Sequence, residues 1–173
     1  MSRRVVITGL GVIAPNANSV GDFNNALRKG VSGIRFIPEL EESGFGCCVA
    51  GAPQGVEELA QAAFDEEELL VMNASQRYAS LASFEAWRDA GLTRREPGDD
   101  TVDWDTGAVL GTGIGGMDVI AERIVPMVNA KKVRRLGSTC VEQVMASGIS
   151  ARISGQLALG NQVTTNSSAC STG

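Results

Sequence analysis

The stretch Val163-Thr-Thr-Asn-Ser-Ser-Ala-Cys-Ser-Thr-Gly173 changes character halfway along its length. Its first part, Val163–Ser168, begins with β-branched side chains and predicts a strand. Its second part, Ala169–Gly173, places one cysteine among small residues and predicts a tight turn into a helix. A thiol at the first turn of a helix faces unpaired N–H groups, so this pattern favours a reactive thiolate at Cys170. A small buried thiol, the usual environment of a single cysteine, explains the same spacing equally well.

Two other runs, Val5–Thr8 and Thr106–Leu110, have the composition of buried strands. A turn over Gly9–Pro15 follows the first run, and a glycine-rich loop, Gly111–Gly116, follows the second. Helical patterns occupy the intervals between the three runs. Strands that alternate with helices predict an α/β domain with a largely parallel or mixed sheet.

Capping residues and helical spacing locate the helices. Ser19 and Asp22 form a capping pair for a helix that ends at Gly30. Further helical segments are predicted over 57–72, over 73–90 before Gly91, over 117–128 with a kink or an end at Pro126, and from Ser138 or Thr139 to Gly160. Residues 31–56 and 94–105 predict connecting loops, the former with room for a short strand.

Composition and charge narrow the class of protein. The chain has 173 residues, of which 43% are hydrophobic, and a net charge of −5. This is the composition of a globular protein, and the negative charge argues against general binding of nucleic acid. No apolar run approaches the ~20 residues of a membrane-spanning helix. Residues 1–14 have a basic tip and a short apolar run like a secretory or twin-arginine signal, but the Gly-x-Gly that follows at once favours a first strand and its turn.

The cysteine and histidine content predicts no metal site. The cysteines are Cys47, Cys48, Cys140 and Cys170, and the sequence contains neither a Cys-x-x-Cys pair nor a histidine. The commonest zinc ligand and the commonest general base are therefore both missing from this sequence. Reduced thiols of this kind are typical of a cytoplasmic protein.

Two glycine motifs have to be weighed as nucleotide-binding loops. Gly9-Leu-Gly-Val-Ile-Ala14 fits the dinucleotide fingerprint, but Pro15 and Asn16 interrupt it and no second strand ends in an acidic residue. Gly111-Thr-Gly-Ile-Gly-Gly116 lacks the Gly-Lys-Ser/Thr of a phosphate-binding loop. We therefore expect no nucleotide cofactor. The second motif is either a tight turn or a loop along which an extended substrate passes close to the backbone.

Several segments together resemble a β-ketoacyl-acyl-carrier-protein synthase of the condensing, thiolase-like superfamily. They occur in the family's order and cover nearly the whole chain. The Ala-Cys-Ser-Thr-Gly segment is specific to the family, and the second and fifth segments are more typical of type I elongating synthases. The segments are Val6-Ile-Thr-Gly-Leu-Gly-Val12, Leu27-Arg-Lys-Gly-Val-Ser-Gly-Ile34, Asp89-Ala-Gly-Leu92, Gly111-Thr-Gly-Ile-Gly-Gly116, Met145-Ala-Ser-Gly148 and Ser168-Ala-Cys-Ser-Thr-Gly173.

The resemblance implies a fold and an assembly. The fold is the first half of a thiolase-like layered αβαβα fold, with residues 1–173 as the amino-terminal part of a ketosynthase domain. The family pairs two similar halves and dimerises through strands near the nucleophile. A homodimer, or a heterodimer with a related subunit, is the implied assembly.

The resemblance also implies a reaction in fatty acid or polyketide synthesis. Cys170 takes an acyl group from an acyl-carrier-protein thioester, and a malonyl-carrier then loses carbon dioxide and attacks the enzyme thioester. Backbone N–H groups, including that of Cys170, form the oxyanion hole. The family's two catalytic histidines and its supporting lysine belong to the carboxy-terminal half. These residues, which lack histidine, are therefore expected to be inactive alone.

The same resemblance implies which side chains bind the carrier protein and which line the acyl pocket. Lys131 and Arg134 match basic positions that hold the acidic carrier protein with its acyl- or malonyl-phosphopantetheine, although a run of charges is usually only a solvated surface. The family tends to carry basic residues where this chain has the acidic run 65–68, so one half of the docking surface is expected to be absent. The acyl pocket is expected to be lined by Gly113, Ile114, Met145 and Ala169, with Ile114 as its gate.

Two other classes of function are compatible with much of this pattern. One is a non-catalytic partner of the chain-length-factor type, in which the nucleophile is typically replaced, so Cys170 argues against it. The other is a thiolase or a coenzyme-A-primed initiating synthase, whose motifs differ at the start of the chain and around the cysteine. Chain-length preference and the choice between fatty acid and polyketide synthesis stay open.

Overall fold

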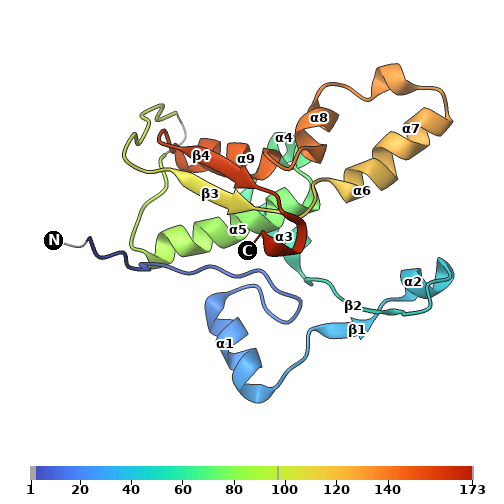
Figure 1. Cartoon of the computed structure of the whole chain (residues 1–173), viewed down its shortest axis with the longest axis horizontal. Coiled ribbons are helices and arrows are strands. Elements are labelled where there is room, and N and C mark those ends of the chain that lie inside the picture. Colours follow the sequence, from blue (N-terminus) through green and yellow to red (C-terminus); the bar gives the residue numbers. More distant parts are fainter. Residues whose placement is uncertain (1–2, 97, 173) are drawn as a thin grey trace. The chain divides into compact units, whose positions relative to one another are not determined.

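The computed structural model describes residues 3–96 and 98–172, so the Gly173 end of the predicted elbow lies outside the described residues. The chain divides into two compact units, and each is described by itself. The first unit comprises residues 1–62 and 81–93, and the second comprises 63–80 and 94–173. Helix α5 (Ala74–Asp89), predicted over 73–90, contributes residues to both units and is followed by Gly91 at φ 74° (Figure 1).

In the first unit, helix α1 (Val20–Lys29) confirms the predicted caps. The Ser19 hydroxyl accepts a hydrogen bond from the Asp22 N–H at 3.1 Å, which satisfies one of the unpaired donors at the helix start. Gly30 ends the helix in the left-handed conformation, at φ 65°, where a glycine has no Cβ to strain.

Residues 31–56 contain more regular structure than the sequence predicts. Strand β1 (Ile34–Phe36) pairs antiparallel with β2 (Val49–Gly51), and the short helix α2 (Pro38–Glu42) lies between them in the chain. Proline opens α2, where its missing N–H costs nothing. Helix α3 (Val56–Ala63) follows. The prediction of a loop with one short strand was therefore too sparse, because three-residue strands carry too little alternation to be detected.

The predicted strand Val5–Thr8 is absent from the described structure. Residues 3–13 run extended without a ladder partner among the described residues, and the side chains of Val5, Val6 and Ile7 are 95%, 71% and 82% exposed. A β-branched run becomes a strand only where a neighbouring backbone supplies hydrogen bonds. Without such a partner, the prediction of a buried strand was wrong for this segment.

The predicted turn over Gly9–Pro15 is also displaced. The backbone passes along α5, where Asp89 accepts from the Leu10 N–H at 2.9 Å and Glu85 accepts from the Val12 N–H at 2.8 Å. A Cβ on either Gly9 or Gly11 would overlap the backbone of α5. These glycines therefore permit close approach to a helix rather than a reversal of the chain. The turn itself lies at Pro15 and Asn16.

The second unit contains the acidic helix α4 (Glu66–Leu70). Its start is a capping box, in which Asp65 accepts from the Glu68 N–H at 2.8 Å and the Glu68 carboxylate accepts from the Asp65 N–H at 3.2 Å. This box begins a new helix, so the single helix predicted over 57–72 is two helices, α3 and α4.

The predicted disturbance at Pro126 takes the form of a widened turn. Helix α6 (Met117–Val119) continues into a π-helical segment, Ile120–Ile124, and then into α7 (Val125–Asn129). Proline cannot donate to the preceding turn, and its ring clashes with the carbonyl four residues earlier. The wider π-helical turn just before Pro126 accommodates that ring without breaking the helix.

The helix predicted from residue 138 or 139 to Gly160 is two helices. Helix α8 (Thr139–Val144) ends where Met145 becomes extended, with ψ 134°, and α9 (Gly148–Leu157) begins three residues later. A Cβ on Gly148 would overlap the Glu142 carbonyl, so a glycine is needed where the two helices meet. Helix α9 ends at Ala158 in the left-handed conformation, two residues before the predicted end.

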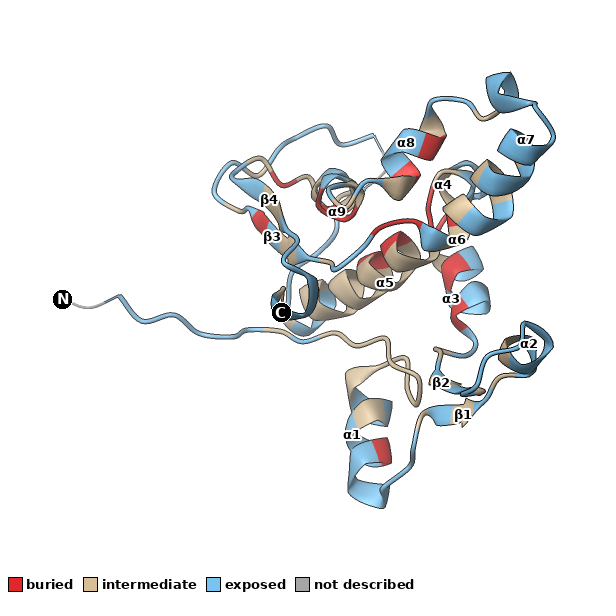
Figure 2. Ribbon diagram, turned by 45° about the vertical axis from the view of Figure 1, so that its right-hand side comes forward, coloured by how far each residue is buried: buried red, intermediate tan, exposed pale blue. Residues whose placement is uncertain are grey.

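Strands β3 (Ala108–Gly111) and β4 (Val163–Asn166) pair in parallel, with Ala108 opposite Val163 (Figure 1). Helix α9 packs on both strands, and Figure 2 shows buried positions on α8 and α9. The core of this unit contains the apolar side chains of Ala108, Ile149, Ile153, Leu157 and Leu159. Parallel strands connected through helices confirm the predicted α/β class. No helix in the described ranges is long and apolar enough to cross a membrane.

Candidate active site

Cys170 lies in a tight turn directly after β4. A single 3₁₀ turn, Ala169–Ser171, follows the strand, and the Cys170 side chain is exposed. Thr172 closes the turn: its hydroxyl accepts from the Ser168 N–H at 2.9 Å and donates to the Ala169 carbonyl at 2.7 Å. The strand-to-turn prediction is confirmed. The cysteine lies in the middle of this 3₁₀ turn, however, and not at the start of an α-helix within the described residues.

The backbone at Ala169 is strained. Its φ is 51°, in the left-handed region that residues with a Cβ rarely occupy. Such strain costs of order 1–3 kcal/mol and persists only where surrounding contacts impose it. Here the two hydrogen bonds of Thr172 hold the turn in this conformation, and the neighbouring Cys170 thiol is exposed.

The glycine-rich loop after β3 lies beside this turn. Because β3 and β4 are parallel, the segments that follow them leave the same edge of the sheet. The Thr112 N–H donates to the Asn166 carbonyl at 3.2 Å, which extends the pairing beyond the strands. A Cβ on Gly113 would lie 3.7 Å from the Ala169 carbonyl oxygen. The predicted pocket residues Gly113 and Ala169 are therefore neighbours, next to Cys170.

The other end of the same loop rests on Met145. A Cβ on Gly115 would lie 2.7 Å from the Val144 carbonyl oxygen and 3.1 Å from the Met145 backbone. The side chains of Ile114 and Met145 are 62% and 49% exposed. One loop thus contacts the cysteine turn at one end and the break between α8 and α9 at the other.

An open cavity of about 500 Å³ lies beside Met145. Helix α9 supplies one side of it, and the Gln156 amide oxygen in that wall accepts from the Ser80 hydroxyl at 2.7 Å. The lining includes Gln76, Met145, Gly148, Ala151, Arg152 and Gln156. Of the four predicted pocket residues, Met145 lines this cavity, whereas Gly113, Ile114 and Ala169 are not part of its lining.

The same unit contains a buried polar cluster that the sequence analysis did not predict. Asn73, Gln76 and Gln143 are 2%, 1% and 4% exposed. The Asn73 amide donates to the Gln143 carbonyl, and the Gln76 amide donates to the Glu142 carbonyl at 3.3 Å. Polar residues in a helical pattern are normally interpreted as a solvated face, so no sequence signal distinguishes them.

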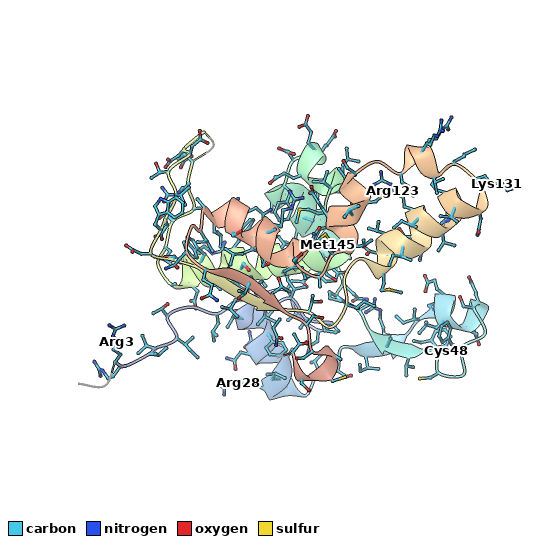
Figure 3. The ribbon with its side chains drawn as sticks, turned by 45° about the horizontal axis from the view of Figure 1, so that its top comes forward. Arg3, Arg28, Cys48, Arg123, Lys131 and Met145 are labelled. Atoms are coloured by element: carbon cyan, nitrogen blue, oxygen red, sulfur yellow. The ribbon has the colours of Figure 1, made fainter. Side chains whose placement is uncertain are left out.

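The predicted docking residues lie on the surface between α7 and α8. Lys131 follows α7 with φ 55°, and Arg134 lies in the 3₁₀ turn Val133–Arg135. Both side chains are exposed, and within the described ranges neither forms an ion pair. Figure 3 shows Lys131 at the outer end of α7, with Arg123 and Met145 nearer to α8.

The acidic run 65–68 has a structural explanation. Its residues form the capping box and the first turn of α4, where carboxylates satisfy unpaired N–H groups and favour the helix dipole. The acidic residues of this run therefore stabilise the start of α4.

No cluster suited to a metal ion occurs over residues 3–96 and 98–172. Asp103 precedes β3 in the chain. The Thr106 hydroxyl, which donates to it at 2.6 Å, holds the pKa of this carboxyl below its usual range, and the Asp105 and Thr106 amides add to the effect. Asp103 thus braces the entry to β3.

Comparison with known proteins identifies the class that this fold and site define. The family profile described as "Beta-ketoacyl synthase, N-terminal domain" matches residues 2–173. The chain belongs to the β-ketoacyl synthase family.

Individual relatives agree with this assignment. The chain is 31% identical over 170 residues to the 3-oxoacyl-[acyl-carrier-protein] synthase 1 of Haemophilus influenzae, covering 98% of this chain and 40% of that protein. The crystal structure of a β-ketoacyl synthase from Burkholderia phymatum superposes with a TM-score of 0.78 at 25% identity, over 99% of this chain and 41% of that one. The ishigamide ketosynthase/chain length factor gives a TM-score of 0.71 at 26% identity, over 95% and 40%. The fold is therefore that of the thiolase-like ketosynthases, and the chain spans about 40% of these relatives' length.

Proposed function

We propose that this chain is the nucleophile-bearing, amino-terminal part of a β-ketoacyl-acyl-carrier-protein synthase. The observation that supports this most is the arrangement at the end of β3 and β4. There, Cys170 is exposed on a strained turn, Gly113 lies beside that turn, and the same loop rests on Met145. A condensing enzyme needs an accessible thiol near the binding site of its acyl chain, and the exposure of Cys170 beside the loop that reaches Met145 supports the proposal.

The proposed chemistry has two steps. First, the Cys170 thiolate attacks the carbonyl carbon of an acyl-phosphopantetheine thioester. The bond to the carrier's sulfur breaks, the acyl group becomes a thioester of Cys170, and the carrier thiol leaves with a proton. Second, a malonyl-carrier loses carbon dioxide, and its carbanion attacks the enzyme thioester. The bond to Cys170 breaks, the thiolate is restored, and a 3-oxoacyl-carrier departs.

The acid–base groups for the second step are not among these residues, which include no histidine. In the full-length protein, we expect them in the region that corresponds to the remaining length of these relatives, of which this chain covers 40%. The backbone N–H of Cys170 is proposed as one donor of the oxyanion hole. Gly113, Ile114, Met145 and Ala169 are proposed as the wall of the acyl pocket.

A condensation assay tests this function. The full-length protein, given acyl-carrier and malonyl-carrier, should release one carbon dioxide per 3-oxoacyl product. Cys170→Ala should lower the rate of acyl transfer by about a thousandfold or more. Cys140→Ala, a change at a buried thiol, is the matched control and should retain the activity. An unchanged rate of acyl-enzyme formation in Cys170→Ala would refute the assignment.

A chain-length-factor subunit is the second candidate, and the similarity to the ishigamide ketosynthase/chain length factor favours it. Such a partner shapes the pocket without forming a covalent intermediate. It would show no acyl-enzyme on Cys170, and would stimulate condensation only when mixed with a separate catalytic subunit. The exposed cysteine favours the catalytic function.

The carrier protein is the proposed macromolecular partner, with Lys131 and Arg134 in its docking surface. The chain carries net negative charge, so attraction of an acidic carrier requires a local basic patch. Because the acidic start of α4 replaces the second anchor, Lys131 and Arg134 should carry more of the docking.

Charge reversal at both positions should raise the KM for acyl-carrier about tenfold at low salt and less at high salt, because exposed charges are screened over ~10 Å at 0.1 M. Turnover of a small thioester mimic should not change. The same reversal at Arg28 and Lys29, which are exposed in the last turn of α1, is the matched control. An equal loss with the small mimic would contradict docking at this segment.

A further inference from the structure

Gln143 is a buried side chain whose two polar ends are both engaged. It is 4% exposed. Its amide oxygen accepts from the Arg123 guanidinium at 3.2 Å, and its amide nitrogen donates to the Leu70 carbonyl at 3.1 Å. Its backbone carbonyl accepts from the Asn73 side chain. A buried amide with every partner fixed has one satisfied orientation, so these bonds hold the end of α8 in one place.

The residues that follow Gln143 support two walls of the proposed pocket. Helix α8 ends at Val144, and Met145 is extended directly after it. Gly116 has φ 57°, and a Cβ there would overlap the Gln143 carbonyl. Gly115 rests on Val144 in the same way. A displacement of this backbone therefore moves Met145 and the loop that carries Ile114 together.

Arg123 connects Gln143 to the proposed docking segment. Its second guanidinium nitrogen donates to the Leu136 carbonyl at 2.8 Å. Leu136 directly follows the 3₁₀ turn that contains Arg134. Figure 3 shows Arg123 on the side of the π-helical segment that faces α8. One half-buried arginine thus joins the surface segment to the residue that anchors the pocket wall.

We propose that Gln143, held by Arg123, is a positioning residue that sets the acyl-chain-length preference by fixing Met145 and the loop carrying Ile114. This inference rests on the proposed function. Gln143 acts through the pocket wall and not on the reacting atoms, so its loss should change which chains fit more than how fast the thiol reacts.

The test measures kcat/KM of the full-length synthase for acyl-carrier primers of short and long chain. Gln143→Leu should shift the long-to-short ratio about tenfold, since a displacement of ~1 Å at a wall can change a rate by about that much or more. The rate with the shortest primer should change by about twofold at most. Glu122→Gln, an isosteric change at the exposed position next to Arg123 and outside the lining of the cavity beside Met145, is the matched control and should leave the ratio unchanged.

Two further variants separate positioning from simple destabilisation. Gln143→Glu keeps the acceptor for Arg123 and loses the donor to the Leu70 carbonyl, so it should shift the ratio less than Gln143→Leu does. Arg123→Met removes the same hydrogen bond from a half-buried side chain, so it carries the test if Gln143→Leu does not fold. The double variant should shift the ratio no further than either single change, because the two residues act as one unit. Equal slowing of all primers, with the ratio unchanged, would overturn the proposal.

Amide hydrogen exchange over residues 143–148 gives a readout that does not depend on activity. Gln143→Leu should accelerate exchange there, and unchanged exchange would overturn the proposal. If the wild-type protein failed to condense substrates while the variant still showed faster exchange, the proposed function would fail and the positioning of this turn would stand.

Discussion

Two glycine-rich segments of this chain follow similar apolar runs and have different structural roles. Gly9 and Gly11 lie in an extended segment of the first unit, and their missing side chains let that segment pass close along α5. Gly111–Gly116 lies in the second unit, and its glycines let one loop contact the cysteine turn and the Met145 break. The glycine pattern predicts a close approach between two backbone segments. Which segments approach each other depends on the tertiary structure.

The runs that precede these glycines differ in the same way. Residues 108–111 form strand β3 because β4 supplies a parallel partner. Val5, Val6 and Ile7 have comparable strand propensity and remain exposed, without a ladder among the described residues. Strand propensity is therefore realised only by pairing, which a single run of sequence does not specify.

The largest expected effect is a loss of stability caused by a substitution in the second segment. Gly116→Ala adds a Cβ at φ 57° against the Gln143 carbonyl and should lower the free energy of unfolding by about 3 kcal/mol. Urea unfolding of the full-length protein measures it. Gly21→Ala is the matched control, because an added Cβ there meets nothing within 4 Å and lies in α1. That change should raise stability by about 0.5–1 kcal/mol.

Gly11→Ala sharpens the comparison between the units. The added Cβ would overlap the Ala82 carbonyl in the first unit, so the variant should also unfold more easily. Among molecules that remain folded, however, the alkylation rate of Cys170 should match the wild type. Gly116→Ala should alter that rate as well as stability. Equal effects of both variants on Cys170 would show that the distinction drawn between the two glycine segments is wrong.

Ile114→Phe gives an intermediate effect confined to the second segment. Ile114 is 62% exposed, so a larger side chain there should be accommodated without loss of stability. If it is the gate of the acyl pocket, phenylalanine should lower kcat/KM for long acyl primers about tenfold and leave the shortest primers nearly unchanged. An equal loss for short and long primers would indicate misfolding instead of gating.

The smallest expected effect concerns the brace of β3. Hydrogen bonds from Thr106 and Asp105 lower the pKa of Asp103, so its contribution to stability is complete above its unfolded pKa of about 3.9 and is lost as pH falls through the lower folded value. Asp103→Asn should therefore reduce the acid dependence of the melting temperature below about pH 4. Asp105→Asn, which changes an exposed carboxyl and keeps the backbone N–H that donates to Asp103, is the control. If the melting temperature of Asp103→Asn fell with pH as steeply as that of the wild type, a stabilising role of the Asp103 carboxylate would be excluded.

Part of this fold followed from local chemistry that a sequence displays. Ser19 with Asp22 capped α1, Gly30 and Gly91 marked helix ends, and the run before Cys170 formed β4. These features depend on residues close together in the chain, so local propensities were sufficient.

The features that were missed depend on contacts between distant residues. Helical apolar spacing continues from Val141 through Ile153, so the sequence predicts one helix and no break at Met145. The break depends on the close contact between Gly148 and the Glu142 carbonyl, which only the structure shows. The link between Arg123 and Gln143 joins positions 20 residues apart and has no periodic signature. For the pocket, a resemblance supplied the residues, and the structure placed Gly113 beside Ala169 and Gly115 beside Met145.

The most direct test of the central claim is to locate the acyl group after the first half-reaction. The full-length protein is incubated with acyl-carrier alone, and peptide mass spectrometry maps the thioester among Cys47, Cys48, Cys140 and Cys170. We predict one acyl group per chain, on Cys170, that a later addition of malonyl-carrier removes as 3-oxoacyl product. Acylation of Cys47 or Cys48 at an equal rate, or no acyl-enzyme at all, would contradict the account.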